Sequence, residues 1–209
     1  MATSSQNEDR ARAYHVGNVR TTLVDIAQAL LREGGLAGLN LRDLSTRTGV
    51  ALGSVYHHFG SKADLLAAMA AQGFTSLKTD LAKAADASDP RLVRNLVVAY
   101  FDFAWREPEL YALMFQAPVA RAQAVVAARE AAFQVFEQAI LAAPAAQGRP
   151  VEMIHDIAVA VWTCAHGAAS LAPIQDEGSD LVESLIGGLE ALFRVGREYR
   201  AYPNGVQPS

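Results

Sequence analysis

Apolar residues recur at intervals of three and four along most of this 209-residue chain, and glycine or proline repeatedly interrupts the spacing. Leu23, Ile26 and Leu30, for example, fall on one face of a predicted helix. No segment shows the alternation of apolar and polar residues that indicates a half-buried strand. The chain is therefore predicted to be all-α, with about nine helices. The predicted ranges are 18–33, 41–48, 52–59, 61–83, 90–106, 108–116, 119–142, 151–171 and 179–198.

The two ends of the chain lack helical periodicity. Residues 1–16 are polar and are predicted to form a flexible arm, and residues 201–209 are predicted to be a disordered tail. No apolar run reaches the roughly 18 residues of a membrane-spanning helix, and the first residues lack the apolar core of a signal peptide. We therefore expect a cytoplasmic protein without a membrane partner. The single cysteine, Cys164, excludes an intramolecular disulfide and favours an inert core thiol over an oxidant sensor.

Two short predicted helices, 41–48 and 52–59, are separated by a tight turn. Gly49 tolerates the left-handed backbone conformation that such a turn requires. Ser45, four residues earlier, is small enough to let the two helices approach, and Val55, six residues later, fills the space between them. This spacing predicts a helix-turn-helix, whose second helix enters the major groove of DNA.

Charge is distributed unevenly along the chain. The net charge of -4 argues against a nucleic-acid partner, because phosphate contacts need a basic surface. Residues 1–62, however, carry seven Lys and Arg against five Asp and Glu, so that this part has a formal charge of +2 and the remainder -6. A mildly basic front end and an acidic body favour a small DNA-binding module followed by a separate domain.

The segments around the predicted helix-turn-helix resemble the TetR family of transcriptional regulators. Residues 40–50 (NLRDLSTRTGV) are similar to the first motif helix of that family. Residues 52–66 (LGSVYHHFGSKADLL) are similar to its recognition helix and to the start of the helix that follows. Residues 101–115 and the Trp-x-x-x-His-Gly signature at 162–167 resemble a subgroup of TetR-like C-terminal domains.

This resemblance implies a TetR-like fold with two domains. A DNA-binding domain of three helices is expected over residues 17–77, with the motif at 40–59, and a helical domain for ligand binding and dimerisation over residues 78–200. The expected partners are a second copy of the chain and a palindromic operator in double-stranded DNA. Repression is the commonest mode of the family, so it is the expected mode here, although the sequence leaves activation open.

The residues of the motif suggest which groups contact DNA. Gly53 has no side chain to hold the backbone off the groove, Ser54 can bond to a base edge or a phosphate, and Leu52 favours a thymine methyl. Lys62 lies in the first turn of the next helix, where an ammonium and free backbone N–H groups suit a phosphate. The resemblance adds a phosphate contact by Tyr56. The candidate DNA contacts are Asn40, Ala51, Leu52, Gly53, Ser54, Tyr56, His57, His58 and Lys62.

Other interpretations of these residues stay open. Tyr56 and Phe59 could be ordinary core aromatics, and His57 and His58 could be a surface pair or part of a metal site. Adjacent side chains on a helix point about 100° apart, so the two histidines chelate one ion poorly. We therefore expect no metal and no cofactor.

The body of the chain is rich in aromatic residues and methionine, most of which are expected to form its core. In TetR-like proteins the ligand pocket lies between the long helix after the DNA-binding domain and the next several helices. His166 is either a polar contact in such a pocket or a core histidine bonded to a backbone carbonyl. Few charges lie on the inner faces, which favours a small apolar or aromatic effector. The candidate ligand contacts are Phe101, Trp105, Met114, Phe115, Phe133, Trp162 and His166.

The last two predicted helices favour dimerisation. Small residues on the first allow close packing, an apolar stripe runs along the second, and paired across a two-fold axis they would form a four-helix bundle. The small residues are Ala158, Ala160, Ala165, Gly167, Ala168 and Ala169. The stripe consists of Leu181, Leu185, Leu189, Leu192 and Phe193.

Two other classes of function compete with a DNA-binding regulator. An enzyme is not expected, because the chain has no Ser/His/acid grouping in a motif context, no glycine-rich phosphate loop after a strand and no metal-ligand spacing. The alternative is a ligand-binding or scaffold protein of the same fold with weak or lost DNA binding, which the acidic composition suggests. Affinity for the DNA upstream of its own gene separates these two possibilities.

Overall fold

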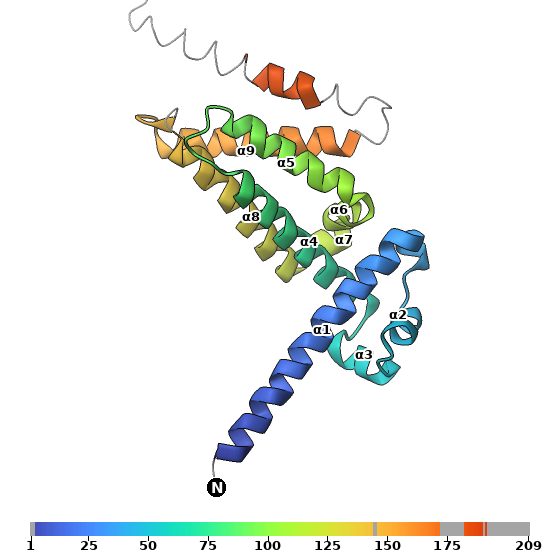
Figure 1. The fold of residues 1–209 in the computed structure, drawn as a ribbon. Helices are drawn as coiled ribbons and strands as arrows, with labels where there is room; N and C mark the ends of the chain where they lie inside the picture. The colour runs from blue at the N-terminus through green and yellow to red at the C-terminus, as the bar shows by residue number, and fades with distance from the viewer. Residues whose placement is uncertain (1–2, 144–145, 172–181, 190, 192–209) are drawn as a thin grey trace, which may run out of the picture. The chain divides into compact units, whose positions relative to one another are not determined.

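The computed structural model describes residues 3–143, 146–171, 182–189 and 191. Within these ranges every regular element is a helix and no strand occurs, which confirms the predicted all-α fold (Figure 1). Residues 182–189 form a helical segment after the last labelled helix. The labelled helices are α1 (Thr3–Gly38), α2 (Leu41–Thr48), α3 (Leu52–His58), α4 (Lys62–Ala84), α5 (Leu92–Arg106), α6 (Pro108–Phe115), α7 (Ala117–Ala120), α8 (Gln123–Ala142) and α9 (Val151–Leu171).

Most helix boundaries lie within two residues of their predicted positions, because capping residues mark them. The Asn40 side-chain oxygen accepts hydrogen bonds from the backbone N–H groups of Arg42 and Asp43 in the first turn of α2. Ser61 Oγ likewise accepts from the backbone N–H of Asp64 at 3.1 Å, as an N-cap serine does. Gly35, with φ 61° and ψ -171°, interrupts the helical backbone of α1 two residues beyond the predicted end of the first helix at residue 33.

Two segments differ from the sequence-based expectation. Helix α1 begins at Thr3, so helical backbone continues through most of residues 1–16, which were predicted to be an arm. Residues 3–16 are mostly polar, so the sequence offers no apolar periodicity from which this part of the helix could be predicted. The single helix predicted over residues 119–142 is instead two helices, α7 and α8, which a turn at residues 121–122 separates. Neither glycine nor proline marks that turn, and residues 201–209 lie outside the described residues.

The chain divides into two compact units. Unit 1 comprises Met1–Ser76 and Glu107–Ala131, and unit 2 comprises Leu77–Arg106 and Ala132–Ser209. Residues 107–131 therefore belong to the same unit as the helix-turn-helix. The functional division between residues 77 and 78 stays a prediction.

The core of unit 1 forms where α1 packs against α2 and α6, and where α2 packs against α3. A Cβ atom at Gly73 of α4 would lie 2.7 Å from Met114 Sδ of α6, so this glycine allows the two helices to approach closely. The largest contributions come from apolar side chains that are at most 1% exposed. They include Leu23, Leu31, Leu44, Val55, Phe59, Leu65, Met69 and Phe74.

The core of unit 2 forms between α5, which packs against α9, and the second part of α8 (Figure 1). Large aromatic side chains of α5 and α8 are almost fully enclosed, and small side chains of α9 allow close helix contact. The aromatic set is Tyr100, Phe101, Phe103 and Phe136. The small set is Ala158, Ala165, Ala168 and Ala169.

Candidate nucleic-acid interface

The turn between α2 and α3 has the geometry of a helix-turn-helix. Gly49 ends α2 with φ 67°, in the left-handed region that favours glycine. Ser45 Oγ donates a hydrogen bond to the carbonyl of Val50 at 2.7 Å and thereby ties α2 to the turn. Val55 of α3 has no exposed surface. The small residue, the glycine and the buried valine therefore hold α3 against α2 as their spacing predicts.

The outward side of α3 carries most of the predicted DNA contacts. Gly53 and His57 are exposed, and Ser54 is partly exposed. Tyr56 is 50% exposed, whereas Phe59 is 1% exposed. Phe59 is thus the core aromatic, while Tyr56 is available for contact with a partner. Of the other candidates, Ala51 is exposed and Leu52 and His58 are partly exposed.

Lys62 and Asn40 lie at the starts of α4 and α2, and both already have partners within the chain. Lys62 Nζ donates a hydrogen bond to the carbonyl of Leu36 at 3.3 Å. Asn40 Oδ1 accepts from the backbone N–H groups of Arg42 and Asp43, at 3.0 and 2.9 Å. Asn40 Nδ2 donates to Asp43 Oδ2 at 2.6 Å. Asn40 is therefore first a helix cap, and only its second amide N–H is left for a phosphate.

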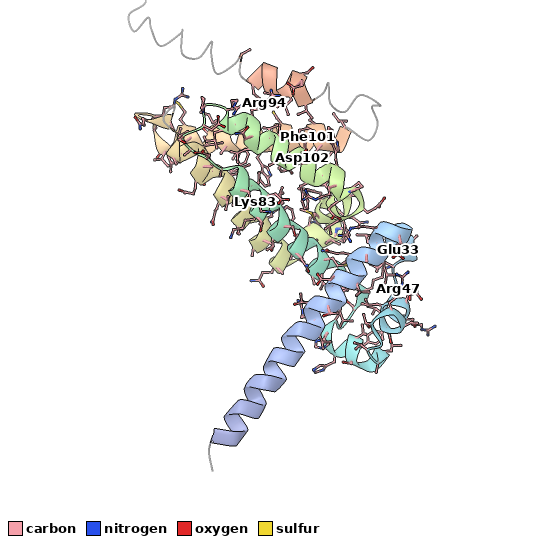
Figure 2. The ribbon with its side chains drawn as sticks, viewed as in Figure 1. Glu33, Arg47, Lys83, Arg94, Phe101 and Asp102 are labelled. Carbon is pink, nitrogen blue, oxygen red and sulfur yellow. The ribbon has the colours of Figure 1, made fainter. Side chains whose placement is uncertain are left out.

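Helix α1 contacts the helix-turn-helix through two side-chain pairs that the sequence did not indicate. The guanidinium carbon of Arg20 lies 4.9 Å from the centroid of the Phe59 ring, within the range of a cation–π contact. Arg47 of α2 forms an ion pair with Glu33 of α1, with Nη1 donating to Oε1 at 2.9 Å (Figure 2). This pairing lowers the pKa of Glu33 and raises that of Arg47. The partners are 14 positions apart, so no local pattern reveals them.

Two family models match the chain over the regions that contain these elements. Residues 23–69 match the model described as bacterial regulatory proteins of the tetR family, which covers the helix-turn-helix. Residues 93–175 match a tetracyclin repressor-like C-terminal domain. The chain belongs to the TetR family.

Two proteins named as transcriptional repressors match part of the chain. The HTH-type transcriptional repressor KstR2 of Rhodococcus jostii (strain RHA1) is 45% identical over 47 residues, which is 22% of this chain and 23% of that protein. KstR2 of Mycobacterium tuberculosis (strain ATCC 25618 / H37Rv) is 37% identical over 54 residues, which is 26% of this chain and 27% of that protein. The match thus spans about a quarter of the length of these relatives.

Solved structures with the TetR fold match most of the chain. A protein with unknown function from Rhodococcus sp. RHA1 has a TM-score of 0.68 and 26% identity, and the match covers 84% of this chain and 93% of that chain. A TetR-family transcriptional regulator from Pectobacterium atrosepticum has a TM-score of 0.66 and 22% identity, with coverage of 86% and 94%. These matches confirm the TetR-like fold.

The residues predicted to line a TetR-type ligand pocket fall in different units. Met114 and Phe115 belong to unit 1, where the Phe115 ring contacts those of Phe74 and Tyr111 at centroid distances of 5.4 and 5.0 Å. Five other candidates belong to unit 2, so the complete lining stays a prediction. The unit 2 candidates are Phe101, Trp105, Phe133, Trp162 and His166.

Trp162 of α9 is the centre of an aromatic cluster in unit 2. Its ring makes edge-to-face contacts with Tyr100, Phe133 and Phe136, at centroid distances of 5.1, 5.6 and 5.6 Å. Tyr100 and Phe136 were not among the predicted ligand contacts. Such pairs stabilise a fold beyond the area they bury, so the cluster contributes to the core of unit 2.

The remaining unit 2 candidates are more accessible. Trp105 is 44% exposed, and its ring contacts Phe101 at a centroid distance of 5.7 Å. His166 lies one helical turn after Trp162, and partial burial lowers the pKa of its imidazole. Burial therefore favours the neutral ring, which can both donate and accept a hydrogen bond.

The exposed side of α9 differs from the small-residue surface expected for dimerisation. Ala158, Ala165 and Ala169 are at most 3% exposed, because they pack within unit 2. Cys164 is exposed, so the expected core thiol is wrong. Of the predicted stripe, Leu185 is partly exposed and Leu189 is 8% exposed. Three members lie outside the described residues or have side chains that are not described: Leu181, Leu192 and Phe193.

Among the described residues, no group of three or more His, Cys, Asp or Glu side chains could hold a metal ion. The rings of His57 and His58 lie edge to face, with centroids 5.8 Å apart. Among the helices of the described ranges, none is long and apolar enough to cross a membrane.

Proposed function

We propose that this chain is a sequence-specific, DNA-binding transcriptional repressor. The observation that carries the proposal is the contrast between the two sides of α3, where Val55 is buried while Tyr56 and His57 are exposed. A short helix held firmly on one side and presenting small and polar groups on the other suits the major groove. The partial matches named as repressors favour repression over activation.

The candidate contacts divide into positioning and reading groups. Tyr56 and Lys62 bind phosphates and set the position of α3, whereas Ser54 and His57 contact base edges. The ammonium of Lys62 has three N–H donors, and the contact with the Leu36 carbonyl uses one of them. Two donors are left for a phosphate at the start of α4, where the helix dipole also favours an anion.

A homodimer is part of the same proposal. The outward side of α9 carries a stripe of apolar and small residues, with Leu171 51% and Met153 36% exposed. Ala160 and Cys164 are exposed on the same side, and Gly167 is partly exposed. The five residues recur at intervals that place them within about 60° of one another on a helix. In a two-fold symmetric dimer, this stripe of one chain would pack against the same stripe of the second chain. Such a dimer has two α3 helices, which suits a palindromic site.

We further propose that a small apolar or aromatic effector binds in unit 2 and releases the protein from DNA. The aromatic side chains around Trp162 and the neutral imidazole of His166 suit such a molecule better than a charged one. Helix α4 begins with Lys62 and continues without a break to Ala84. An effector that binds more tightly when α4 is displaced would therefore also displace Lys62, the proposed phosphate contact. A coupling of ~1 to 3 kcal/mol corresponds to a 5- to 150-fold loss of operator affinity.

The test is selection of sites from a library of random double-stranded DNA by the full-length chain, with a Tyr56→Ala/Lys62→Ala variant as the control. Both side chains are exposed, so the variant is expected to fold. The proposal predicts a palindromic consensus for the unaltered chain and none for the variant. Equal recovery of random sequences by both proteins contradicts it and supports a ligand-binding or scaffold protein instead.

The effector is tested with a panel of apolar and aromatic compounds, with tryptophan emission as the readout. Trp105 and Trp162 are the only tryptophans of the chain. Compounds that quench emission must bind more weakly in the presence of the selected DNA, by the same factor by which they weaken DNA binding. Equal binding with and without DNA excludes release by these compounds.

A further inference from the structure

The end of α1 contacts three other helices of unit 1 through residues that are almost consecutive. Arg32 pairs with Glu107 at the start of α6, and Glu33 pairs with Arg47 of α2. The carbonyl of Leu36 accepts the hydrogen bond from Lys62 at the start of α4. We call Arg32, Glu33 and Leu36 the α1 junction. All of these contacts lie within unit 1.

The contact with α6 has the geometry of a specific ion pair. Arg32 Nε donates to Glu107 Oε2 at 2.8 Å, and Arg32 Nη2 donates to Glu107 Oε1 at 3.1 Å. This two-point arrangement fixes direction as well as distance. The Glu107 side chain is 17% exposed, so the pair is better shielded from water than the pair of Glu33 and Arg47, which are 52% and 48% exposed.

Glu107 is the N-cap residue of α6, yet its side chain makes no capping hydrogen bond to that helix. Ser, Thr, Asp and Asn are the residues that ordinarily cap a helix from this position. The longer Glu107 side chain extends to Arg32 of α1 instead. Arg32 therefore binds the start of α6, and the next residue of α1, Glu33, binds α2.

We propose that the α1 junction couples the position of α6 to the helices that contact DNA, with Arg32 as the positioning residue. A shift of α6 displaces Arg32 through Glu107. Because Glu33 is the next residue of the same helix, the displacement reaches Arg47 and α2. Leu36, beyond the interruption at Gly35, extends it to Lys62. This route runs through α1 and the motif. It differs from the displacement along α4 in the proposed effector response, and its importance for DNA binding rests on the proposed function.

The test measures backbone hydrogen exchange in α2 of the full-length chain without DNA. Glu107→Gln keeps the shape of the side chain and removes its charge. The coupling predicts that α2 amides of this variant exchange about two- to fivefold faster, although the ion-pair partner of Glu107 lies in α1. Arg106→Gln is the matched control, because Arg106 is the adjacent residue but pairs with Asp80 in unit 2. Unchanged exchange in Glu107→Gln, or equal acceleration in the control, overturns the proposal.

Two further variants separate coupling from a general loss of stability. The exchanged pair Arg32→Glu/Glu107→Arg restores the attraction and is expected to restore slow exchange in α2. Arg47→Gln removes the last link, so that adding Glu107→Gln to it is expected to have no further effect. If the exchange rates of the two single variants instead multiply in the double variant, the residues act independently and the coupling is wrong.

The same experiment distinguishes this inference from the proposed function. If Glu107→Gln speeds exchange in α2 but the unaltered chain selects no DNA sequence, the coupling is supported and the proposed function is wrong. If the unaltered chain selects a palindrome but Glu107→Gln does not change exchange in α2, only the coupling is wrong.

Discussion

The geometry of the helix-turn-helix depends on residues that are close together in the sequence, whereas the aromatic region of unit 2 is built mainly from residues that are far apart. In α2 and α3, local signals determine the geometry, because Asn40 caps one helix and Gly49 ends it in a conformation that favours glycine. In unit 2, residues of α5, α8 and α9 meet around Trp162, and only Phe133 and Phe136 are close together in the sequence. A local motif thus indicates both a shape and a function, whereas a cluster of aromatic residues from several helices indicates a core.

The largest effect that tests this difference is truncation of the aromatic cluster. Phe136 has no exposed surface and contacts Trp162, so Phe136→Ala is expected to lower the free energy of unfolding by about 3–5 kcal/mol. Tyr56→Ala, at a half-exposed position of α3, is expected to change it by less than about 0.5 kcal/mol. Urea denaturation followed by circular dichroism measures both. Similar losses in the two variants would break the distinction between a folding cluster and a binding surface.

The second effect concerns backbone conformation within the motif. Gly49 has a φ of 67°, so Gly49→Ala is expected to cost about 1–2 kcal/mol of folding free energy. Gly53 is the matched control, because it lies inside α3 and an added Cβ meets nothing within 4 Å. Gly53→Ala is expected to stabilise the chain by roughly 0.5–1 kcal/mol while weakening DNA binding, since the methyl group would face the groove. A stabilised variant with unchanged DNA affinity would remove Gly53 from the interface.

The third effect separates positioning from reading within the motif. Tyr56→Phe and Lys62→Ala are each expected to weaken binding to all DNA sequences by about 1 kcal/mol, because phosphates carry no sequence information. Ser54→Ala and His57→Ala are instead expected to change which sequence is preferred. Fluorescence anisotropy with the selected site and a scrambled duplex gives both affinities. If Lys62→Ala altered the preferred sequence, its assignment to a phosphate would be wrong.

The smallest effect concerns the pH dependence of unit 2. Burial lowers the pKa of His166 from its ordinary value of 6.5, so the unfolded chain binds this proton at a higher pH than the folded chain. Stability is therefore expected to fall as the pH decreases below about 6.5, until the pH passes the folded pKa. His166→Gln should remove this part of the pH dependence. Thermal unfolding of both proteins at several pH values tests it, and an identical dependence in the variant would rule out His166 as the cause.

Much of the fold could be predicted from the sequence because its signals are local. Asn40, Gly49 and Ser61 act on backbone groups within a few residues, so their positions indicate where helices begin and end. The pairing of Arg32 with Glu107 could not be predicted, because the partners are 75 positions apart and meet only when α1 packs against α6. The helical start of α1 was missed for a different reason, since residues 3–16 are mostly polar and their sequence shows no apolar periodicity.

The candidate site divides in the same way. The exposure of Tyr56 and the burial of Phe59 follow from helical spacing around Val55, so their roles could be separated once α3 was located. Asn40 caps α2, as its place directly before that helix predicts, and its contact with DNA stays a prediction. For the pocket, residue type did not distinguish the enclosed Tyr100 from the exposed Trp105, because both occur in one apolar helix.

Hydroxyl-radical footprinting of the selected DNA by the full-length chain, combined with sedimentation of the complex, tests directly whether α3 reads DNA. Two protected half-sites related by two-fold symmetry are expected, with centres about one helical turn, ~34 Å, or slightly more apart. An even number of chains on each duplex is also expected, as is loss of protection in the Tyr56→Ala/Lys62→Ala variant. Uniform protection without half-sites, or a footprint unchanged in that variant, would contradict the assignment of α3 as the DNA-reading helix.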